Sequence, residues 1–310
     1  MGSRQPLPAW DLLDRVGCHV SFLLLAWRRA VQAPRGRGKR RELMGHEIKL
    51  IGALEGLREL PDKSVDLGFT DPAYNTLEKH RETGTTTRLK NSKSSSNEWF
   101  PTVDFDYLTE VFKEYYRVLK KPAHLYVMCD EETGDNLKPI LREIGFAQRK
   151  SLIWSKVGKH EDVHCPNCGT FVTKKHRPGT PGMSYPWRSS YEMILFFEKG
   201  KRRAPEDRSQ RNVQPYPWIK SKGAYPTEKP VGLIEKIIAQ SSDEGDLVVD
   251  AFAGSGSTGE AAFNLGRNFL GFDVEQKALD RFEARKKHWT REDGELVEDV
   301  APSGGIFDLF

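Results

Sequence analysis

Residues 247–259, which read LVVDAFAGSGSTG, decide the fold class of this chain. An apolar run ends at the carboxylate of Asp250, as in a buried strand, and the small residues after it predict a tight turn into a helix. Gly254 and Gly256 let the backbone approach a ligand where side chains would clash. The helix that follows offers free N–H groups. The stretch therefore predicts a strand, a ligand-binding turn and a helix.

A second strand indicates what kind of ligand this turn would hold. Residues 269–273, FLGFD, end in Asp273, and an acid about twenty residues after such a turn reaches the ribose hydroxyls of an adenosine cofactor. An NAD site would need its glycine-rich turn near the start of the fold. Here the turn lies near residue 254, with little chain left for a substrate domain, which disfavours NAD. A turn that binds no ligand is the remaining alternative.

The rest of the chain alternates between strand and helix patterns. This alternation is typical of an α/β fold, with a mostly parallel sheet covered by helices on both faces. Two polar stretches, 76–100 and 158–188, are expected to be irregular. The expected strands are 65–70, 124–128, 150–157, 191–197, 247–251 and 269–273, and the expected helices are 108–118, 136–144, 231–239, 257–265 and 276–288.

A short motif with chemical content follows the predicted strand at 65–70. It reads Asp71-Pro72-Ala73-Tyr74. The carboxylate and the neighbouring backbone carbonyl can accept both hydrogens of a planar exocyclic amine, and the aromatic ring can stack on the base that carries it. The alternative is an ordinary turn acid.

Residues 226–230, Pro-Thr-Glu-Lys-Pro, form a third motif, just before the predicted helix at 231–239. From the residues alone, this segment predicts the start of a helix, because proline stiffens the chain and Thr227 can cap the first turn.

These three motifs, in this order and spacing, resemble the β group of DNA amino-methyltransferases. In that family the catalytic motif Asp-Pro-Pro-Tyr comes first, a variable target-recognition region follows, and the S-adenosylmethionine motif Phe-x-Gly-x-Gly comes last. A Pro-Thr-Glu-Lys-Pro segment upstream of the glycine-rich strand lines the cofactor pocket. The resemblance covers roughly residues 44–290. It implies a Rossmann-like, S-adenosylmethionine-dependent methyltransferase fold.

The resemblance also implies a set of site residues and shows two departures. Ala73 replaces the second proline of the catalytic motif, which loosens the backbone there. Gly52 is followed by Ala53, where many relatives carry an acid. The implied catalytic residues are Asp71, Pro72 and Tyr74, and the implied cofactor-binding residues are Asp250, Phe252, Gly254, Gly256, Asp273, Thr227 and Lys229.

The expected reaction is site-specific transfer of a methyl group from S-adenosylmethionine to the N6 amine of adenine in double-stranded DNA, as in restriction–modification. Asp71 and the Pro72 carbonyl would orient the amine so that its lone pair faces the methyl sulfonium. The base must be flipped out of the duplex, with Tyr74 as its stacking platform.

Three other functions remain open from the sequence. Cytosine-N4 methylation shares all of this chemistry, although cytosine-N4 relatives mostly carry Ser at the first motif position, where adenine-specific relatives mostly carry Asp or Asn. RNA and protein-glutamine methyltransferases usually carry Asn there, whereas this chain has Asp71. A catalytically silent DNA-binding protein would fit if Ala73 disrupts the site.

The remaining segments are expected to serve DNA binding. Residues 158–224 are expected to be an inserted target-recognition region within a methyltransferase domain at 44–310. Residues 199–222 carry eight Lys or Arg against two acids, and Tyr216 and Trp218 are expected to insert or stack there. Residues 1–43 are expected to be a disordered basic extension, with a nucleic-acid-binding arm as the alternative.

Composition places the chain among globular proteins of a reducing compartment. It has 310 residues, 30% of them charged, a net charge of +4 and four cysteines, too few for a disulfide framework. The apolar stretch at 20–27 is far too short to span a bilayer. We expect a cytoplasmic protein, bacterial or phage-encoded, with no membrane partner, and leave a homodimer open.

A cysteine pair raises the question of a metal. Cys165 and Cys168 form a Cys-x-x-Cys-Gly knuckle that suits zinc thiolates. A second cysteine pair is absent, so His164 and His176 would have to complete the site. Free thiols in a solvated loop are the favoured alternative, and a redox role is the third.

Overall fold

The structure is a computed structural model that describes residues 45–73, 102–164, 168, 171–178, 190–201, 205–219, 228–289, 291–292 and 295–296. All of them belong to one compact unit, Leu43–Phe310. Several sequence expectations lie outside the described residues: the extension at 1–43, the loop at 76–100, and the residues Tyr74, Cys165 and Thr227.

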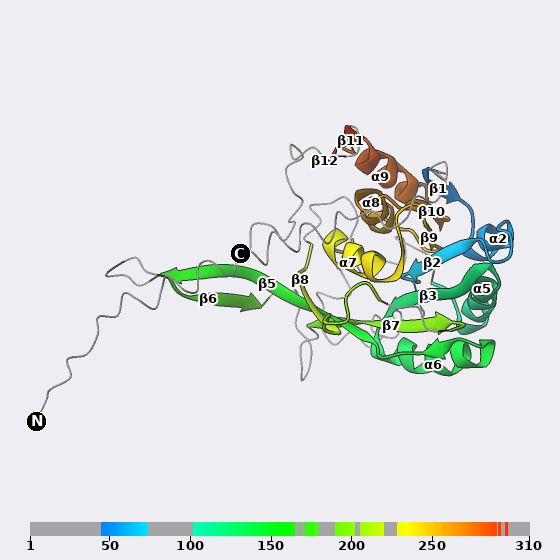
Figure 1. Ribbon diagram of the computed structural model, residues 1–310, viewed down its shortest axis with the longest axis horizontal. Coiled ribbons are helices and arrows are strands. Elements are labelled where there is room, and N and C mark those ends of the chain that lie inside the picture. Colours follow the sequence, from blue (N-terminus) through cyan, green and yellow to red (C-terminus); the bar gives the residue numbers. More distant parts are fainter. Residues whose placement is uncertain are drawn as a thin grey trace, which may run out of the picture. The chain divides into compact units, whose positions relative to one another are not determined.

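One mixed sheet forms the centre of the described part of the chain (Figure 1). Five neighbouring strands are parallel, and the strands beyond β3 are antiparallel to their neighbours, apart from the short β8, which runs parallel to β5. The order is β1 (His46–Leu50), β10 (Asn268–Asp273), β9 (Leu247–Asp250), β2 (Val65–Thr70), β3 (Leu119–Cys129), β7 (Tyr191–Lys199), β5 (Leu152–His164) and β6 (Phe171–Pro178). β4 (Ala147–Gln148) pairs with β7, β8 (Val213–Pro217) pairs with β5, and β11 (Arg291–Glu292) pairs with β12 (Glu295–Leu296) in a separate ribbon.

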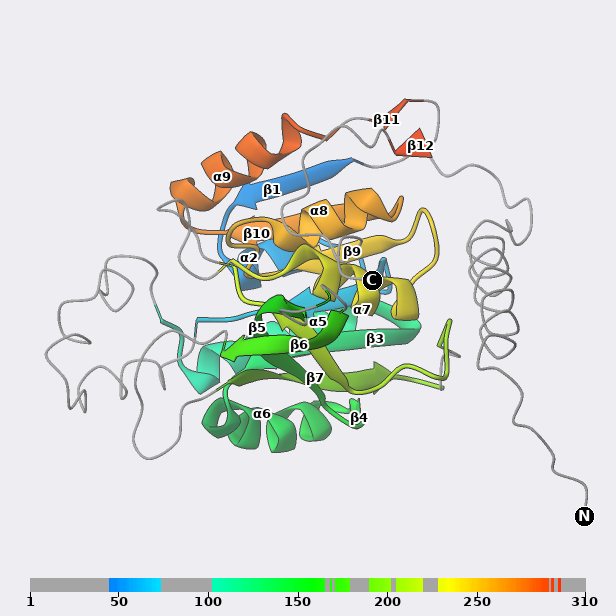
Figure 2. The same ribbon diagram turned by 90° about the vertical axis from the view of Figure 1, so that its left-hand side faces the viewer.

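Helices cover both faces of the sheet, as the alternation predicts (Figures 1 and 2). One apolar core packs against α2 (Ala53–Arg58), α5 (Phe105–Val118) and α6 (Glu131–Ile144), and a second against α7 (Val231–Ser241), α8 (Ser257–Asn264) and α9 (Gln276–Lys286). Successive side chains of a strand point to opposite faces. Leu247 and Val249 therefore join the first core, and Val248 joins the second. The α/β fold with helices on both faces is confirmed.

Local sequence signals explain where the helices begin and end. The side chains of Asp104 and Asp130 accept hydrogen bonds from the backbone N–H groups of Tyr107 and Thr133, each at 2.8 Å, and so cap α5 and α6. Gly145, with φ of +116°, ends α6 in the left-handed conformation.

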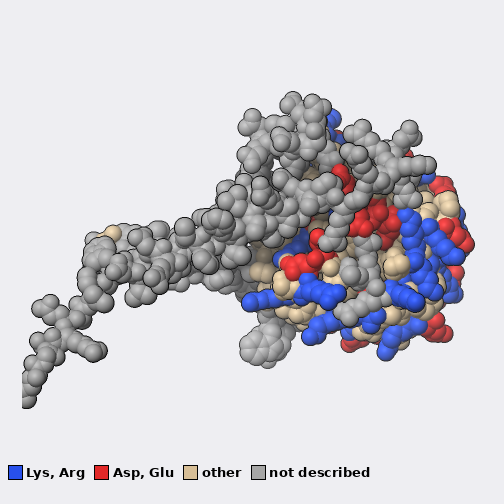
Figure 3. All heavy atoms as spheres, viewed as in Figure 1, with Lys and Arg blue, Asp and Glu red and all other residues tan. Residues whose placement is uncertain are grey.

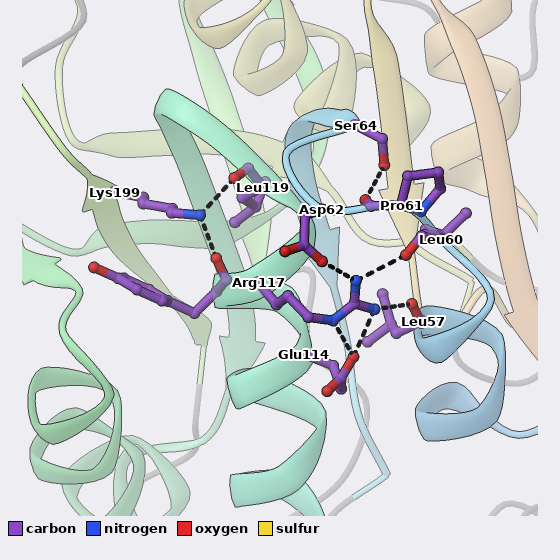
Figure 4. Close-up of polar contacts among 10 residues, drawn as sticks. Leu57, Leu60, Pro61, Asp62, Ser64, Glu114, Arg117, Leu119 and Lys199 are labelled. Atoms are coloured by element: carbon purple, nitrogen blue, oxygen red, sulfur yellow. Dashed lines mark hydrogen bonds and ion pairs between the residues drawn. The ribbon is translucent and has the colours of Figure 1, made fainter.

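Arg117, on α5, binds the end of α2 and the turn that follows it (Figure 4). Its guanidinium donates to the carbonyls of Leu57 and Leu60, each at 2.9 Å, at the end of α2. It also pairs with Asp62 at 2.6 Å and Glu114 at 2.7 Å. The turn that leads into β2 is thereby fixed from the neighbouring helix.

Figure 4 also shows why Lys199 cannot contact DNA, contrary to the sequence-based expectation for the basic segment. Its side chain is buried, and its ammonium donates to the carbonyls of Tyr116 and Leu119. Tyr216 is likewise buried in the second core and cannot stack on a base. A charge count over 199–222 could not separate buried from exposed side chains.

The expectation that residues 158–188 are irregular is wrong for two stretches. Residues 158–164 continue β5, and residues 171–178 form β6, with the backbone of His160 opposite that of His176. Neither stretch alternates apolar with polar residues, so neither shows the strand pattern of a half-buried sheet. The two strands pair in antiparallel register through their backbones.

Candidate active site

The two motifs that lie far apart in sequence end side by side in the sheet. β2 and β9 are neighbours, with Leu67 in register with Val248. Ligands of open α/β sheets bind beyond the carboxyl ends of the strands. A cavity of about 280 Å³ lies there, and its walls include Asp71, Pro72, Lys229, Asp250, Phe252, Gly254 and Asp273. Every described residue of the predicted site except Gly256 therefore lines one pocket.

Asp71 forms an ion pair with Lys229, and both residues line this pocket. The Lys229 ammonium lies 2.8 Å from Asp71 Oδ2 and 3.3 Å from Glu192 Oε2. Burial raises the pKa of the Asp71 carboxyl, and the Lys229 charge opposes that rise. Burial acts to lower the pKa of Lys229, but the two carboxylates outweigh it and raise that pKa, so Lys229 is a cation at neutral pH.

Glu192 and Lys156 complete the charged group, and the sequence analysis missed both. Glu192 Oε1 lies 2.5 Å from Lys156 Nζ, and Glu192 lines the pocket, whereas Lys156 does not. Burial acts to raise the pKa of Glu192, but Lys229 and Lys156 outweigh it and lower that pKa. A usable signal existed, since Glu192 is an acid near the start of the apolar strand YEMILFF.

The glycine-rich turn is held by two carboxylates that face inward. Asp250 accepts hydrogen bonds from Phe252 N at 3.1 Å and Thr258 Oγ1 at 2.6 Å, and burial raises its pKa to about 7. Asp273 accepts from Gly254 N at 2.8 Å and Glu275 N at 2.9 Å, and burial raises its pKa as well. Both acids thus shape the loop directly.

The two glycines of this turn have different roles. Gly254 lines the pocket with φ of +51°, a conformation that glycine adopts readily. Gly256 does not line the pocket. A Cβ there would lie 2.3 Å from Phe282 Cδ2, and its φ is +76°. Gly256 is therefore needed for the packing of α9 against the turn, a reason that the sequence pattern did not reveal.

Ala73 does not leave the catalytic motif loose. Its carbonyl accepts a hydrogen bond of 2.8 Å from Val103 N. The backbone after Asp71 is therefore anchored to the segment that leads into α5, in place of the rigidity that a second proline would give. Tyr115 of α5 anchors the neighbouring strand end instead, because its hydroxyl accepts from Ala251 N at 2.8 Å and donates to Val249 O at 3.3 Å, at the end of β9.

Glu228, beside Lys229, is fixed by a buried arginine that the sequence analysis did not single out. Arg285, 7% exposed, pairs with both Glu228 and Glu260, and donates to Ser257 Oγ at 3.2 Å. Burial lowers the pKa of Arg285 to about 10, which still leaves it charged at neutral pH. The arginine joins the pocket wall to α8 and α9.

The proposed zinc ligands are only partly described. Cys168 is exposed, and the backbone of His164 lies opposite Phe171 in the β5–β6 hairpin. Among the residues that the structure describes, no group of three or more His, Cys, Asp or Glu side chains could hold a metal ion. Within the same ranges, no helix is long and apolar enough to cross a membrane.

Changing the turn should weaken cofactor binding. Asp273→Ala removes the acceptor of two backbone N–H groups and is expected to weaken affinity for S-adenosylmethionine about ten- to a hundredfold. Gly254→Val forces a β-branched residue into positive φ and is expected to do at least as much. Calorimetric titration measures both. Asp280→Ala, at an exposed acid of α9, is the control, and wild-type affinity in both pocket variants would refute the assignment.

Known proteins resemble this chain in sequence and in fold. DNA adenine methyltransferase YhdJ of Escherichia coli (strain K12) is 29% identical over 272 residues, which cover 76% of this chain and 81% of that protein. The crystal structure of the M1.HpyAVI–SAM complex superimposes with a TM-score of 0.54 at 22% identity, covering 77% of this chain and 98% of the other. The cytosine-N4-specific PvuII DNA methyltransferase gives 0.54 at 18% identity, covering 82% and 88%.

The family model N6_N4_Mtase, described as DNA methylase, matches residues 65–284. That range runs from the first residue of β2 to the last turn of α9, so it includes every residue that lines the pocket except Ala53, and with them the glycine-rich turn and the charged group around Lys229. The chain belongs to this family of DNA methylases.

Proposed function

We propose that this protein transfers a methyl group from S-adenosylmethionine to the N6 amine of adenine in double-stranded DNA, in the bacterial cytoplasm. The observation that carries the proposal is the position of Asp71, at the end of β2 and in one pocket with the glycine-rich turn after β9. Membership of the DNA methylase family supports the substrate class, and the SAM complex of M1.HpyAVI supports the cofactor.

The residues of the pocket fit an adenosine cofactor. Phe252 and Val274 supply apolar walls, and Asp273, whose carboxylate accepts from Gly254 N and Glu275 N, lines the same pocket and can also accept from ribose hydroxyls. When bound, the cofactor supplies an electrophilic methyl group on a sulfonium. Gly254, with no side chain, leaves room for the ligand to approach the backbone.

Asp71 and Pro72 would orient the exocyclic amine of the substrate base. The Asp71 carboxylate would accept one hydrogen of the exocyclic amine, and the Pro72 carbonyl the other. The lone pair of the nitrogen then points away from both acceptors and toward the cofactor. The carboxylate would also stabilise the positive charge that grows on the nitrogen as the N–C bond forms and the C–S bond of the sulfonium breaks. The methylated nitrogen then loses one proton to solvent, which leaves a neutral methylamino group. Positioning and charge stabilisation supply the catalysis, without a covalent enzyme intermediate.

The case for DNA rests on the family and the site rather than on a basic patch. Figure 3 shows Lys and Arg intermixed with Asp and Glu on the face of the molecule that it presents. A target base must leave the duplex to reach a pocket at the strand ends, so the reaction requires base flipping.

Product analysis tests the choice of target atom. We expect N6-methyladenine after incubation of unmethylated duplex DNA with the protein and labelled cofactor, followed by nucleoside digestion and mass spectrometry. Asp71 at the first motif position and the similarity to DNA adenine methyltransferase YhdJ favour adenine. Protein with Asp71→Ala is the control for contaminating activity. N4-methylcytosine without N6-methyladenine would overturn the adenine assignment and favour the alternative that the PvuII enzyme represents.

A further inference from the structure

Four charged side chains form a row behind the reacting position. Lys156 Nζ lies 2.5 Å from Glu192 Oε1, Glu192 Oε2 lies 3.3 Å from Lys229 Nζ, and Lys229 Nζ lies 2.8 Å from Asp71 Oδ2. The signs alternate along the row and sum to zero. The side chains come from β5, from β7, from the residue before Pro230 at the start of α7, and from the end of β2. None is more than 27% exposed.

The chemistry of Asp71 explains what such a row is needed for. A carboxyl that accepts a hydrogen from an amine must be ionised, because a protonated carboxyl would present a donor instead. Burial at this position favours the neutral form and raises the pKa of Asp71. The nearby Glu192 carboxylate raises it further, and the Lys229 and Lys156 cations lower it. The ionised state of Asp71 therefore depends on the lysines.

Glu192 has two opposing effects on Asp71. It repels a second negative charge, but it also holds the Lys229 ammonium in place at 3.3 Å. Lys156 in turn neutralises Glu192 at its other oxygen, Oε1. Each group thus acts on its neighbour, and only Lys229 contacts the carboxylate that meets the substrate.

We propose that Lys229, Glu192 and Lys156 are positioning residues that act through Asp71: Lys229 contacts its carboxylate and holds it ionised and in one orientation, and the charges of Glu192 and Lys156 set its ionisation from farther along the row. The inference rests on the proposed function, because it concerns the same amine-binding acid. Lys156 does not line the pocket. An effect of Lys156 on the chemical step would therefore travel along the row rather than through contact with substrate or cofactor.

Other titratable groups face Asp71 from neighbouring strands and must be separated from the row. Asp250, at the end of β9, has a pKa of about 7 and interacts with Asp71, and Cys129 of β3 is a buried thiol whose pKa is raised far above neutral. Asp250 and Asp273 both accept hydrogen bonds from the glycine-rich turn, and burial raises the pKa of both. Saturating cofactor therefore keeps their effect on cofactor affinity out of the measured methyl-transfer rate.

The test is the pH dependence of the single-turnover rate of methyl transfer, measured with DNA and S-adenosylmethionine at saturating concentrations. The acid limb is the part of this profile in which the rate falls toward low pH. In wild type the rate falls as pH drops through the pKa of Asp71, because protonation removes the acceptor. In Lys229→Met and Lys156→Met a cation is lost, so the acid limb should move to higher pH. In Glu192→Gln a like charge is lost while Lys229 remains beside Asp71, so the limb should move to lower pH. If the row sets the charge of Asp71, the acid limb therefore moves to higher pH in the two lysine variants and to lower pH in Glu192→Gln.

Controls separate this outcome from simple damage. Lys113→Met removes an exposed lysine of α5 that pairs with Glu110 at 2.7 Å, and its acid limb should coincide with that of wild type. Adenine protonation is common to all variants and cancels in the comparison. Glu192→Gln is nearly isosteric and Lys156→Met lies outside the pocket, so these two variants decide the matter if Lys229→Met does not fold.

Two failures are distinguishable. Absence of methyl transfer by the wild-type protein would refute the proposed function itself. An active wild type whose acid limb is unchanged in both Lys156→Met and Glu192→Gln, or shifts in the same direction in both, would overturn the positioning row and leave the function standing.

Discussion

Asp71→Ala is expected to lower the single-turnover rate of methyl transfer by at least about 10²–10³-fold, the scale seen when one preorganised group at a developing charge is removed. Affinity for S-adenosylmethionine should stay close to that of wild type, because the glycine-rich turn is held by Asp250 and Asp273 and not by Asp71. Radiolabel transfer to DNA measures the first quantity, and calorimetry the second.

Two matched variants sharpen this result. Asp71→Asn keeps the shape of the side chain but loses its charge, so it should be nearly as slow as the alanine variant. Asp62→Ala removes an exposed acid that pairs with Arg117 in a distant turn, and it should transfer methyl groups at the wild-type rate. A turnover of Asp71→Ala near the wild-type value would exclude this carboxylate from catalysis.

Arg285→Ala is expected to lower the free energy of unfolding by about 3–5 kcal/mol, the cost of breaking a buried ion pair from one side. The arginine is 7% exposed and pairs with Glu228 and Glu260, whose carboxylates would remain without it. Denaturant unfolding monitored by circular dichroism measures the loss. Cofactor affinity should fall as well, because Glu228 precedes Lys229 in the pocket wall.

The neighbouring Arg281 provides the comparison. It lies 3.5 Å from the same Glu228 but is 32% exposed, so water screens the pair. Arg281→Ala should therefore cost about 0–1 kcal/mol. Equal losses in the two variants would show that burial does not set the strength of this cluster.

Periodicity was sufficient to predict most of the fold. The helical spacing of Leu108, Val111, Phe112, Tyr115 and Val118 predicted α5, and all five side chains are buried. The apolar runs at 65–70 and 247–251 predicted β2 and all of β9, with one residue too many at the end of β9. These elements bury one face or both, and burial leaves a pattern in the sequence.

The elements that were missed lack this pattern. β6 reads FVTKKHRP and pairs through its backbone at the end of the sheet, so no apolar alternation marks it. β8 lies inside a basic segment, yet Gln214 and Tyr216 point inward and are buried. Counting the charged residues of such a segment does not reveal which of its side chains are buried.

Site residues that lie in short local motifs could be predicted from the sequence. Residues whose partners are far away in sequence could not. Asp71, Lys229 and Asp273 were found because each lies in a short recognisable motif, and the structure places all three in one pocket. Lys156, Glu192 and Arg285 act only through residues far away in sequence. Arg285 in particular looks like any basic residue in the last turn of a helix.

The strand order has a consequence for the time at which the protein can become active. Leu67 pairs with Val248, and β1 pairs with β10. While the chain is being synthesised, β2 can pair with β3 early, but β1 must wait for β10, and β2 must wait for β9 on its other side. Contacts between such distant segments form slowly, because a long loop must close first. The pocket is therefore incomplete until the residues through Glu275 have been synthesised, and shorter nascent chains lack part of its wall.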